Sequence, residues 1–219
     1  MFFVVNDLLL GGFDPRLQDN IDTLNLLTGL CDAHSLTYCI TPPLSTIKTA
    51  PVTQPNVILL LNFTNAQRTW LLTSPSTRAL LYTPTNEHFG IIPVEGMVSC
   101  LPVLACNSGG PTESIIDPEF SGKPGEVRTG WLRPPEANAW SAAILEILQL
   151  SARERVSLGQ RARQRAVATF SLDAMAKSIE EALQEAVKSG EVEGQLLYWC
   201  KTILSVFVLC TAFWQYYSI

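Results

Sequence analysis

The strongest constraint on the fold of this chain comes from three short apolar runs, each followed by a polar turn and then by a helical pattern. The runs cover residues 57–61, 79–82 and 102–106. Short apolar runs without alternation are typical of strands buried on both faces, and helices between such strands indicate parallel connections. The sequence therefore predicts an α/β fold, a parallel sheet with helices on both of its faces.

Turn and cap residues divide the rest of the chain into further elements. Additional strands are expected at residues 4–10, 35–40 and 129–132. A structural turn at Gly11 and Gly12 ends the first of these, and the proline-rich stretch 41–56 is expected to be a loop. Helices are expected from about Pro15, at 65–74, 93–100, 112–116, 139–150 and 151–170, and from Ser171 to about Lys188.

The charge and the cysteines exclude some classes of partner and site. The net charge of −5 argues against nucleic acid, because phosphate binding requires a basic face. The arginines between Arg153 and Arg165 are expected to form a solvated helix face. The six cysteines form no C-x-x-C pair and lie near no histidine cluster, so no metal or other cofactor is expected. Cys100 and Cys106 lie in apolar runs and are predicted to be buried thiols.

The last part of the chain is strongly apolar. Residues 202–217 contain no charged side chain, and aromatic residues flank this stretch. A spanning helix needs about 20 apolar residues, a length reached here only by counting from Leu196 and including Lys201. The alternatives are a spanning or re-entrant helix, an interfacial helix and a soluble core helix. We expect a hydrophobic, membrane-associated helix at 196–219.

Two glutamates at the end of a predicted strand carry the candidate site. Glu87 lies in the loop after residues 79–82, and Glu95 lies in the first turn of the following helix. About one pair of glutamates at this spacing is expected by chance, so the spacing alone is weak evidence. Each residue also has an ordinary alternative: a solvated loop carboxylate for Glu87, a helix-dipole residue for Glu95. Gly90 lets backbone N–H groups approach a ligand, and open α/β sheets bind ligands at the carboxyl ends of their strands. These features predict a site for a polyhydroxylated, anionic molecule such as a nucleotide sugar.

A second polar loop follows the next strand. Asn107, Ser108, Gly109 and Gly110 can offer backbone N–H groups to a phosphate or a sugar, although alone they read as an ordinary turn. Adjacent parallel strands would bring this loop beside the first one. His88 is expected to be packed or hydrogen-bonded rather than to act as an acid or base.

Several strings in the chain match a known family. They cover residues 9–16, 82–97, 102–111, 129–132 and 170–172. In these strings the chain resembles the donor-binding domain of retaining GT-B glycosyltransferases, which have two Rossmann-like domains. More narrowly, it resembles the alpha-1,3/1,6-mannosyltransferases that extend the dolichol-linked oligosaccharide in N-glycan assembly. The resemblance implies a Rossmann-like nucleotide-sugar binding domain at 1–135 and C-terminal helices packing on it at 136–190, followed by the membrane-associated segment 196–219.

The resemblance also implies a role for each site residue. Glu87 would be catalytic, close to the reacting carbon of the donor mannose, and Glu95 would bind the ribose hydroxyls. The remaining donor-binding residues would be His88, Phe89, Gly90, Ile91, Asn62, Phe63, Thr64, Asn107, Ser108, Gly109 and Gly110. Of these, the backbone from Phe89 to Ile91 would hold sugar and diphosphate, and residues 62–64 would lie along the base.

The partners follow from the same resemblance. The donor would be GDP-mannose and the acceptor a mannosyl-chitobiose on dolichyl diphosphate, with no metal required. The protein would lie at the cytoplasmic face of the endoplasmic reticulum membrane.

The chain departs from this family at its beginning. It starts at what corresponds to the second strand of the donor domain, without the Arg and Lys loop that clamps the diphosphate and without an acceptor-binding domain. We therefore expect an N-terminally truncated piece that is inactive or incomplete, with two strand edges left unpaired. The alternatives are a membrane-anchored non-catalytic remnant or partner-binding module, and a glycosyltransferase that uses another nucleotide sugar.

Overall fold

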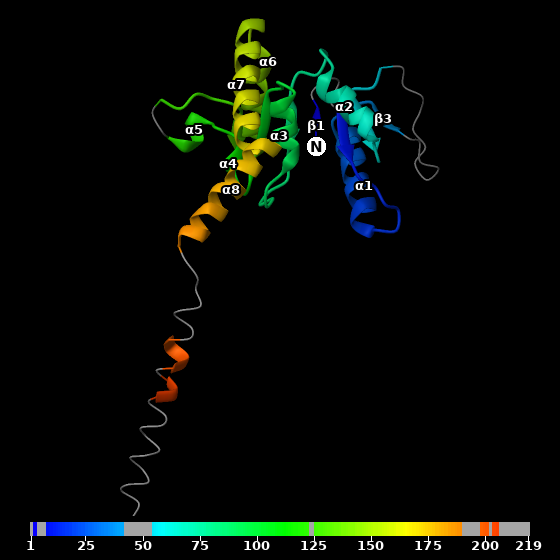
Figure 1. The fold of residues 1–219 in the computed structure, drawn as a ribbon. Helices are drawn as coiled ribbons and strands as arrows, with labels where there is room; N and C mark the ends of the chain where they lie inside the picture. The colour runs from blue at the N-terminus through cyan, green and yellow to red at the C-terminus, as the bar shows by residue number, and fades with distance from the viewer. Residues whose placement is uncertain are drawn as a thin grey trace, which may run out of the picture. The chain divides into compact units, whose positions relative to one another are not determined.

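The computed structural model describes residues 2–3, 8–41, 54–122, 125–189, 198–201 and 203–205. By its internal contacts the chain divides into two units, Met1–Ser171 and Leu172–Ile219. The first unit contains the sheet and all the residues of the candidate site (Figure 1). The domain boundaries expected at 135 and 190 stay predictions.

A sheet with the strand order β3-β4-β2-β1-β5-β6-β7 forms the centre of the first unit. The strands are β1 (Phe2–Phe3), β2 (Leu8–Gly11), β3 (Tyr38–Thr41), β4 (Val57–Leu61), β5 (Leu80–Tyr82), β6 (Val103–Cys106) and β7 (Trp131–Arg133). β4 pairs in parallel with β2 and β3, and β6 pairs in parallel with β5 and β7. The predicted parallel strands are confirmed, and residues 4–7 of the first expected strand lie outside the described residues.

The short strand β1 joins the two parallel parts of the sheet. It runs antiparallel to both β2 and β5, with Phe2 opposite Leu9 and Leu81. The expectation of two unpaired strand edges is therefore wrong. Since β2 and β5 are both antiparallel to β1, they point in the same direction, and all the parallel strands end at one edge of the sheet. β1 also marks the point where the strand order reverses, which is where open α/β sheets bind ligands.

The helices follow the predicted order, with differences at their beginnings. They are α1 (Gln18–Ala33), α2 (Asn65–Thr73), α3 (Ile91–Val98), α4 (Pro111–Ser114), α5 (Pro118–Ser121), α6 (Ala137–Gln149), α7 (Ala152–Phe170) and α8 (Leu172–Lys188). α1 begins at Gln18 rather than near Pro15, because the Leu17 N–H donates to the Asp14 carbonyl (3.0 Å) and closes a turn first. α3 begins earlier than expected because Gly90, at φ 75°, turns the chain into the helix. α5 is not predicted from the sequence.

Helices cover both faces of the sheet, as predicted (Figure 1). On one face, Leu80, Tyr82, Val103 and Ala105 pack with apolar residues of α2, α3 and α7. On the other face, Leu81, Leu104 and Trp131 pack with α6, and α1 covers β3 and β4. Alternate residues of one strand therefore enter different clusters, as the pleat of a strand requires.

The second unit contains α8, whose apolar side chains are exposed. These are Leu172, Met175, Ile179, Leu183 and Val187. The hydrophobic helix predicted at 196–219 lies mostly outside the described residues, apart from helical residues at 198–201 and 203–205. Over the stretches that the structure describes, no helix combines the length and the apolar character needed to cross a membrane. The membrane-associated helix therefore stays a prediction.

Candidate functional site

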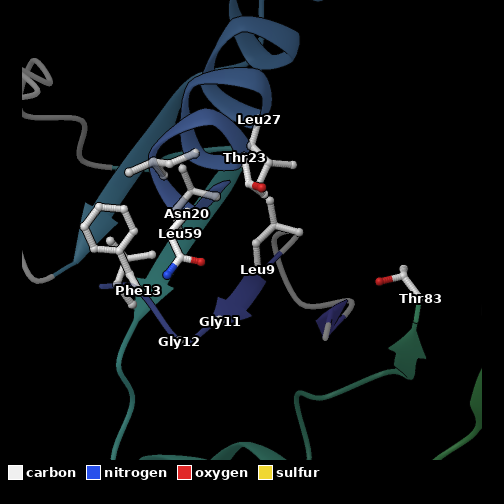
Figure 2. A pocket seen from close by; sticks show the side chains of 11 residues that line it. Leu9, Gly11, Gly12, Phe13, Asn20, Thr23, Leu27, Leu59 and Thr83 are labelled. Carbon is white, nitrogen blue, oxygen red and sulfur yellow. The ribbon is translucent and has the colours of Figure 1, made fainter. Parts of the chain in front are cut away.

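A hollow of about 270 Å³ lies between α1 and the carboxyl-terminal parts of β2 and β4, and Thr83, which follows β5, borders it at the point where the strand order reverses. Leu9, Gly11 and Phe13 line it from β2 and the following loop, and Thr83 lines it from the end of β5. Figure 2 shows Leu9, Phe13 and Asn20 gathered on one side, with Thr83 lying apart from them. The hollow is largely apolar, and it can take a flat or apolar part of a ligand.

Asn62 fastens together the loops that follow β2 and β4. Its side-chain oxygen accepts a bond from the Phe13 N–H, and its side-chain nitrogen donates to the Phe13 carbonyl, each at 2.8 Å. Its own N–H donates to the Gly11 carbonyl (2.9 Å). Asn62 has a φ of 53°, a left-handed conformation that asparagine tolerates better than most residues. The contact predicted between Asn62 and the base of the nucleotide-sugar donor would therefore involve a residue whose side chain already organises this loop.

The loops after β5 and β6 are interlocked. The Asn86 N–H donates to the Ser108 hydroxyl (3.0 Å), and the Gly110 N–H donates to the Glu87 carbonyl (2.8 Å). Added β-carbons at Gly109 and Gly110 would overlap the backbones of Glu87 and Phe89, respectively. Only glycine permits this approach, and Gly109 additionally has a φ of 64°. The prediction that the two polar loops lie side by side is confirmed.

Tyr82, the last residue of β5, supports the Glu87 side chain from below. Tyr82 is 5% exposed, and its hydroxyl lies beside the Glu87 side chain, since both adjoin Gly90. Burial first, and then the charge and hydrogen bond of Glu87, raise the pKa of Tyr82. A tyrosine that keeps its proton donates to a carboxylate, so Tyr82 helps to fix the Glu87 side chain.

Glu95 forms an ion pair that the sequence does not indicate. The Arg68 Nη1 atom on α2 lies 2.9 Å from Oε1 and 3.1 Å from Oε2 of Glu95 on α3. The two side chains are 32% and 25% exposed. Arg68 follows the capping box that Thr64 and Gln67 form at the start of α2. Thr64, which is predicted to line the base, therefore also fixes the beginning of the helix that carries Arg68.

The beginning of α3 presents backbone N–H groups at the site. Gly90 is its N-cap and provides no side chain to bond these groups, and the amino end of a helix attracts anions. His88 and Phe89 are exposed beside it, and Phe89 contacts the ring of Phe170 edge-on, with centroids 5.4 Å apart. This contact ties the Glu87 loop to the end of α7.

Four of the five arginines of α7 donate to backbone carbonyls outside α7, so the predicted solvated face is wrong for them, whereas Arg153 is exposed and makes no such bond among the described residues. Arg163 donates to the Val98 carbonyl at the end of α3. Arg165 donates at 2.7 Å to the carbonyls of Glu113 and Ser114 at the end of α4. Arg155 donates to the Arg78 and Ile147 carbonyls. Since helix carboxyl ends carry unbonded carbonyls and partial negative charge, α7 stabilises the far ends of the two helices that begin at the site.

The cysteines correct a second prediction. Cys106 is buried, as expected, and its thiol donates to the Thr83 carbonyl (3.2 Å). Burial raises the pKa of Cys106. Cys100, however, is exposed, because it follows α3 in a left-handed turn (φ 60°) rather than lying in a strand. Within the described stretches, no group of three or more potential metal ligands is found, and the expected independence from metal stays a prediction.

Comparison with known proteins places this arrangement in a family. Residues 54–165 match the model of the family described as Glycosyl transferases group 1. The chain belongs to this family. The matched range contains the loops that carry Glu87 and Gly110 and both partners of the Arg68–Glu95 pair.

The chain is similar to proteins that are named alpha-1,3/1,6-mannosyltransferases. It is 36% identical to alg2 of Schizosaccharomyces pombe over 208 residues, covering 94% of this chain and 38% of that protein. It is 36% identical to ALG2 of Rhizomucor pusillus over 178 residues, covering 81% and 36%. For ALG2 of Saccharomyces cerevisiae the identity is 32% over 182 residues, covering 81% and 36%. The chain thus spans little more than a third of the length of these relatives.

Solved structures show the same fold. Sucrose-phosphate synthase from Thermosynechococcus elongatus matches with a TM-score of 0.57 and 25% identity, covering 84% of this chain and 39% of that one. Anabaena HepE in complex with UDP matches with a TM-score of 0.57 and 19% identity, covering 81% and 40%. The first unit therefore has a GT-B-like α/β fold, as predicted.

The structure brings most of the predicted site residues to one edge of the sheet. Residues 86–90 and 107–110 meet directly, and 62–64 lie at the end of β4, although their predicted roles stay predictions. The residues that sequence reasoning misses are Arg68, Tyr82 and Phe170. A usable signal exists for Arg68, a cation in the first turn of a helix that begins just beyond a strand's carboxyl end.

Proposed function

We propose that this chain is the donor-binding part of a retaining mannosyltransferase that uses GDP-mannose and acts in assembly of the N-glycan precursor. The proposed acceptor is a mannosyl-chitobiose on dolichyl diphosphate. The observation that carries the proposal is the interlocking of the loops after β5 and β6. It fixes Glu87 next to the uncapped beginning of α3, while Glu95 lies within the same helix. The similarity to alpha-1,3/1,6-mannosyltransferases supports the choice of sugar.

Each part of the site has a proposed task. The diphosphate lies at the N–H groups that begin α3, because these attract negative charge. The Glu87 carboxylate lies against the mannose, and Glu95 accepts hydrogen bonds from the ribose hydroxyls. In the transfer, the bond between the anomeric carbon and the diphosphate oxygen breaks. That carbon then bonds to the acceptor hydroxyl oxygen, whose proton passes to the departing diphosphate.

Isothermal titration of the full chain tests the donor. GDP-mannose should bind more tightly than UDP-glucose. Glu95→Gln should weaken the binding of GDP-mannose and of GDP alike. Glu87→Gln should weaken the binding of GDP-mannose and leave the affinity for GDP unchanged. We expect losses of about tenfold, the size of a charge-assisted hydrogen bond. Glu113→Gln, a change at an exposed carboxylate on α4, is the matched control.

Two results would overturn the proposed donor. One is UDP-glucose binding as tightly as GDP-mannose, which would assign the chain to another nucleotide sugar. The other is no nucleotide binding at all, which would favour the non-catalytic alternative.

We further propose that the chain lies at the cytoplasmic face of the endoplasmic reticulum membrane and that residues 196–219 attach it there. The uncharged stretch 202–217 supports attachment to a membrane, and the choice of membrane and face rests on the resemblance to the mannosyltransferases. Carbonate extraction of the expressed chain should leave it in the membrane pellet. Release by carbonate would show peripheral attachment instead.

A further inference from the structure

The Arg68–Glu95 pair connects helices that lie on the same face of the sheet. Leu71 and Leu72 of α2 are buried in one cluster with Val94 and Met97 of α3. Arg68 lies three and four residues before these leucines, so it shares their side of α2. The packing that buries the leucines therefore also delivers the Arg68 guanidinium to Glu95. The pair's geometry is set by the core rather than by two mobile surface chains.

The form of this contact leaves the Glu95 carboxylate able to bind more donors. A single nitrogen of Arg68, Nη1, lies near both oxygens. A carboxylate has about four lone-pair sites, so each oxygen retains acceptor capacity. Glu95 is already three-quarters covered, and a ligand above it would remove the remaining water. A carboxylate buried without a countercharge is strongly unfavourable, and Arg68 supplies that countercharge in advance.

We infer that Arg68 is a positioning residue for nucleotide recognition, holding the Glu95 carboxylate oriented toward the two ribose hydroxyls of the donor. This inference rests on the proposed function, because it requires Glu95 to bind ribose. It adds a residue, and a reason, to that site. Arg68 acts through Glu95 and is not assigned a contact with the reacting atoms.

The competing interpretation is an ion pair that only joins α2 to α3. Under both interpretations, loss of Arg68 lowers stability, so stability cannot separate them. The ribose hydroxyls can. If Arg68 acts through Glu95, its removal weakens the binding of a nucleotide that has both ribose hydroxyls and hardly affects the binding of one that lacks them. If Arg68 only joins the helices, its removal weakens the binding of both nucleotides by the same factor.

The experiment is isothermal titration of the full chain with GDP and with 2′,3′-dideoxy-GDP. The wild-type chain should prefer GDP by about tenfold or more, since hydroxyl bonds to a charged acceptor are lost in the dideoxy ligand. Arg68→Met should weaken GDP by about tenfold and dideoxy-GDP by less than about twofold. Arg68→Lys should restore part of the preference, because it retains the charge. Arg153→Met is the matched control, because Arg153 is exposed and makes no hydrogen bond or ion pair within the described part of the chain, and it should change neither affinity.

The outcomes are distinguishable. Equal weakening of both nucleotides in Arg68→Met would overturn the positioning role while leaving the proposed function intact. Equal binding of GDP and dideoxy-GDP by the wild-type chain would remove the ribose role of Glu95 and this inference with it. No GDP binding by the wild-type chain would overturn the proposed function as well. If circular dichroism shows that Arg68→Met is unfolded, Arg68→Gln provides the same comparison, and an unchanged preference in it would equally overturn the inference.

Discussion

The two parts of the sheet on either side of β1 differ in how firmly their elements are held. In the part that contains β5, β6 and β7, every residue of β5 and β6 is buried, and α7 bonds the ends of α3 and α4. In the part that contains β2, β3 and β4, burial alternates along β4, and α1 leaves Leu26 and Leu30 exposed. The candidate site draws on both parts. The loops proposed to bind the sugar are fixed to the firmer part, while the hollow near Phe13 belongs mainly to the other.

This difference bears on how precisely each part of a bound donor would be held. Proposed contacts to the reacting end of the donor come from loops whose backbones are interlocked, whereas the proposed base region comes from loops joined chiefly by Asn62. The Arg68–Glu95 pair joins α2, which follows β4, to α3, which follows β5, and so links the two sets of loops. Substitutions in each part of the sheet measure how much the two parts differ in stability, and the largest effect is expected at Asp117.

Asp117 anchors the firmer part, and its loss should be severe. Its carboxylate is fully buried. It pairs with Arg128 and Arg133 and accepts a bond from the Leu132 N–H (2.9 Å). Asp117→Ala leaves two largely covered arginines without this charge and should lower the free energy of unfolding by about 3–5 kcal/mol. Urea unfolding followed by circular dichroism measures this change in the free energy of unfolding. Glu119→Gln, at a carboxylate that is 57% exposed, should cost about 1 kcal/mol or less, and comparable losses in both variants would contradict this account.

Arg165 should contribute more than an arginine on the solvent side of the same helix. Arg165→Met removes two charge-assisted bonds to the end of α4, a loss of about 1.5–3 kcal/mol. Arg153→Met, on α7 as well, should leave the free energy of unfolding within about 0.5 kcal/mol of wild type. Chemical denaturation of both variants at the same salt concentration makes the comparison. Equal effects would restore the interpretation of a solvated arginine face.

Asn62 tests the connection in the less firmly held part. Asn62→Ala removes both bonds to Phe13 and places alanine at φ 53°, so we expect a loss of about 1 kcal/mol. Asn86→Ala is a matched control, because Asn86 has a similar φ of 55° and its side chain makes no hydrogen bond to another described residue. Thermal unfolding should rank Asn62→Ala below Asn86→Ala. Equal effects would mean that the backbone strain common to both positions, rather than the bonds to Phe13, dominates.

The smallest expected effect is a difference in thiol reactivity. Cys31 lies on α1 and Cys106 on β6, and both are buried. If the part with α1 opens more readily, native-state alkylation should modify exposed Cys100 first, then Cys31, then Cys106. Mass spectrometry of timed samples gives this order. Faster modification of Cys106 than of Cys31 would reverse the comparison between the two parts.

The pH dependence of Cys106 has a defined sign. Its pKa is raised in the folded state by burial, so its contribution to stability is complete below the unfolded thiol's pKa of about 8.5 and is lost as pH rises through the folded value. A Cys106→Ala variant should therefore lose less stability than wild type between neutral and alkaline pH. Parallel losses in unfolding titrations would show that Cys106 makes no such contribution.

The sequence predicts the elements better than the contacts between them. Val57–Leu61 is found as predicted because a short, uninterrupted apolar run between turns is typical of a buried strand. The meeting of the Glu87 and Gly110 loops follows from the parallel order of adjacent strands. In contrast, Phe2 and Phe3 form too short a strand to show a period, so β1 is unpredictable. Helical spacing also cannot reveal that Arg163 and Arg165 reach carbonyls of α3 and α4, because these contacts depend on how distant helices pack.

The antiparallel direction of β1 has a practical consequence for anyone handling this protein. Phe2 pairs with Leu9 and Leu81, and Phe3 with Leu8 and Leu80. The chain therefore enters the sheet from the edge that carries the candidate site. Any affinity tag or fusion partner attached ahead of Phe2 would emerge beside the mouth of the hollow, where it could obstruct a nucleotide. Titrations should accordingly be made after cleavage of an N-terminal tag.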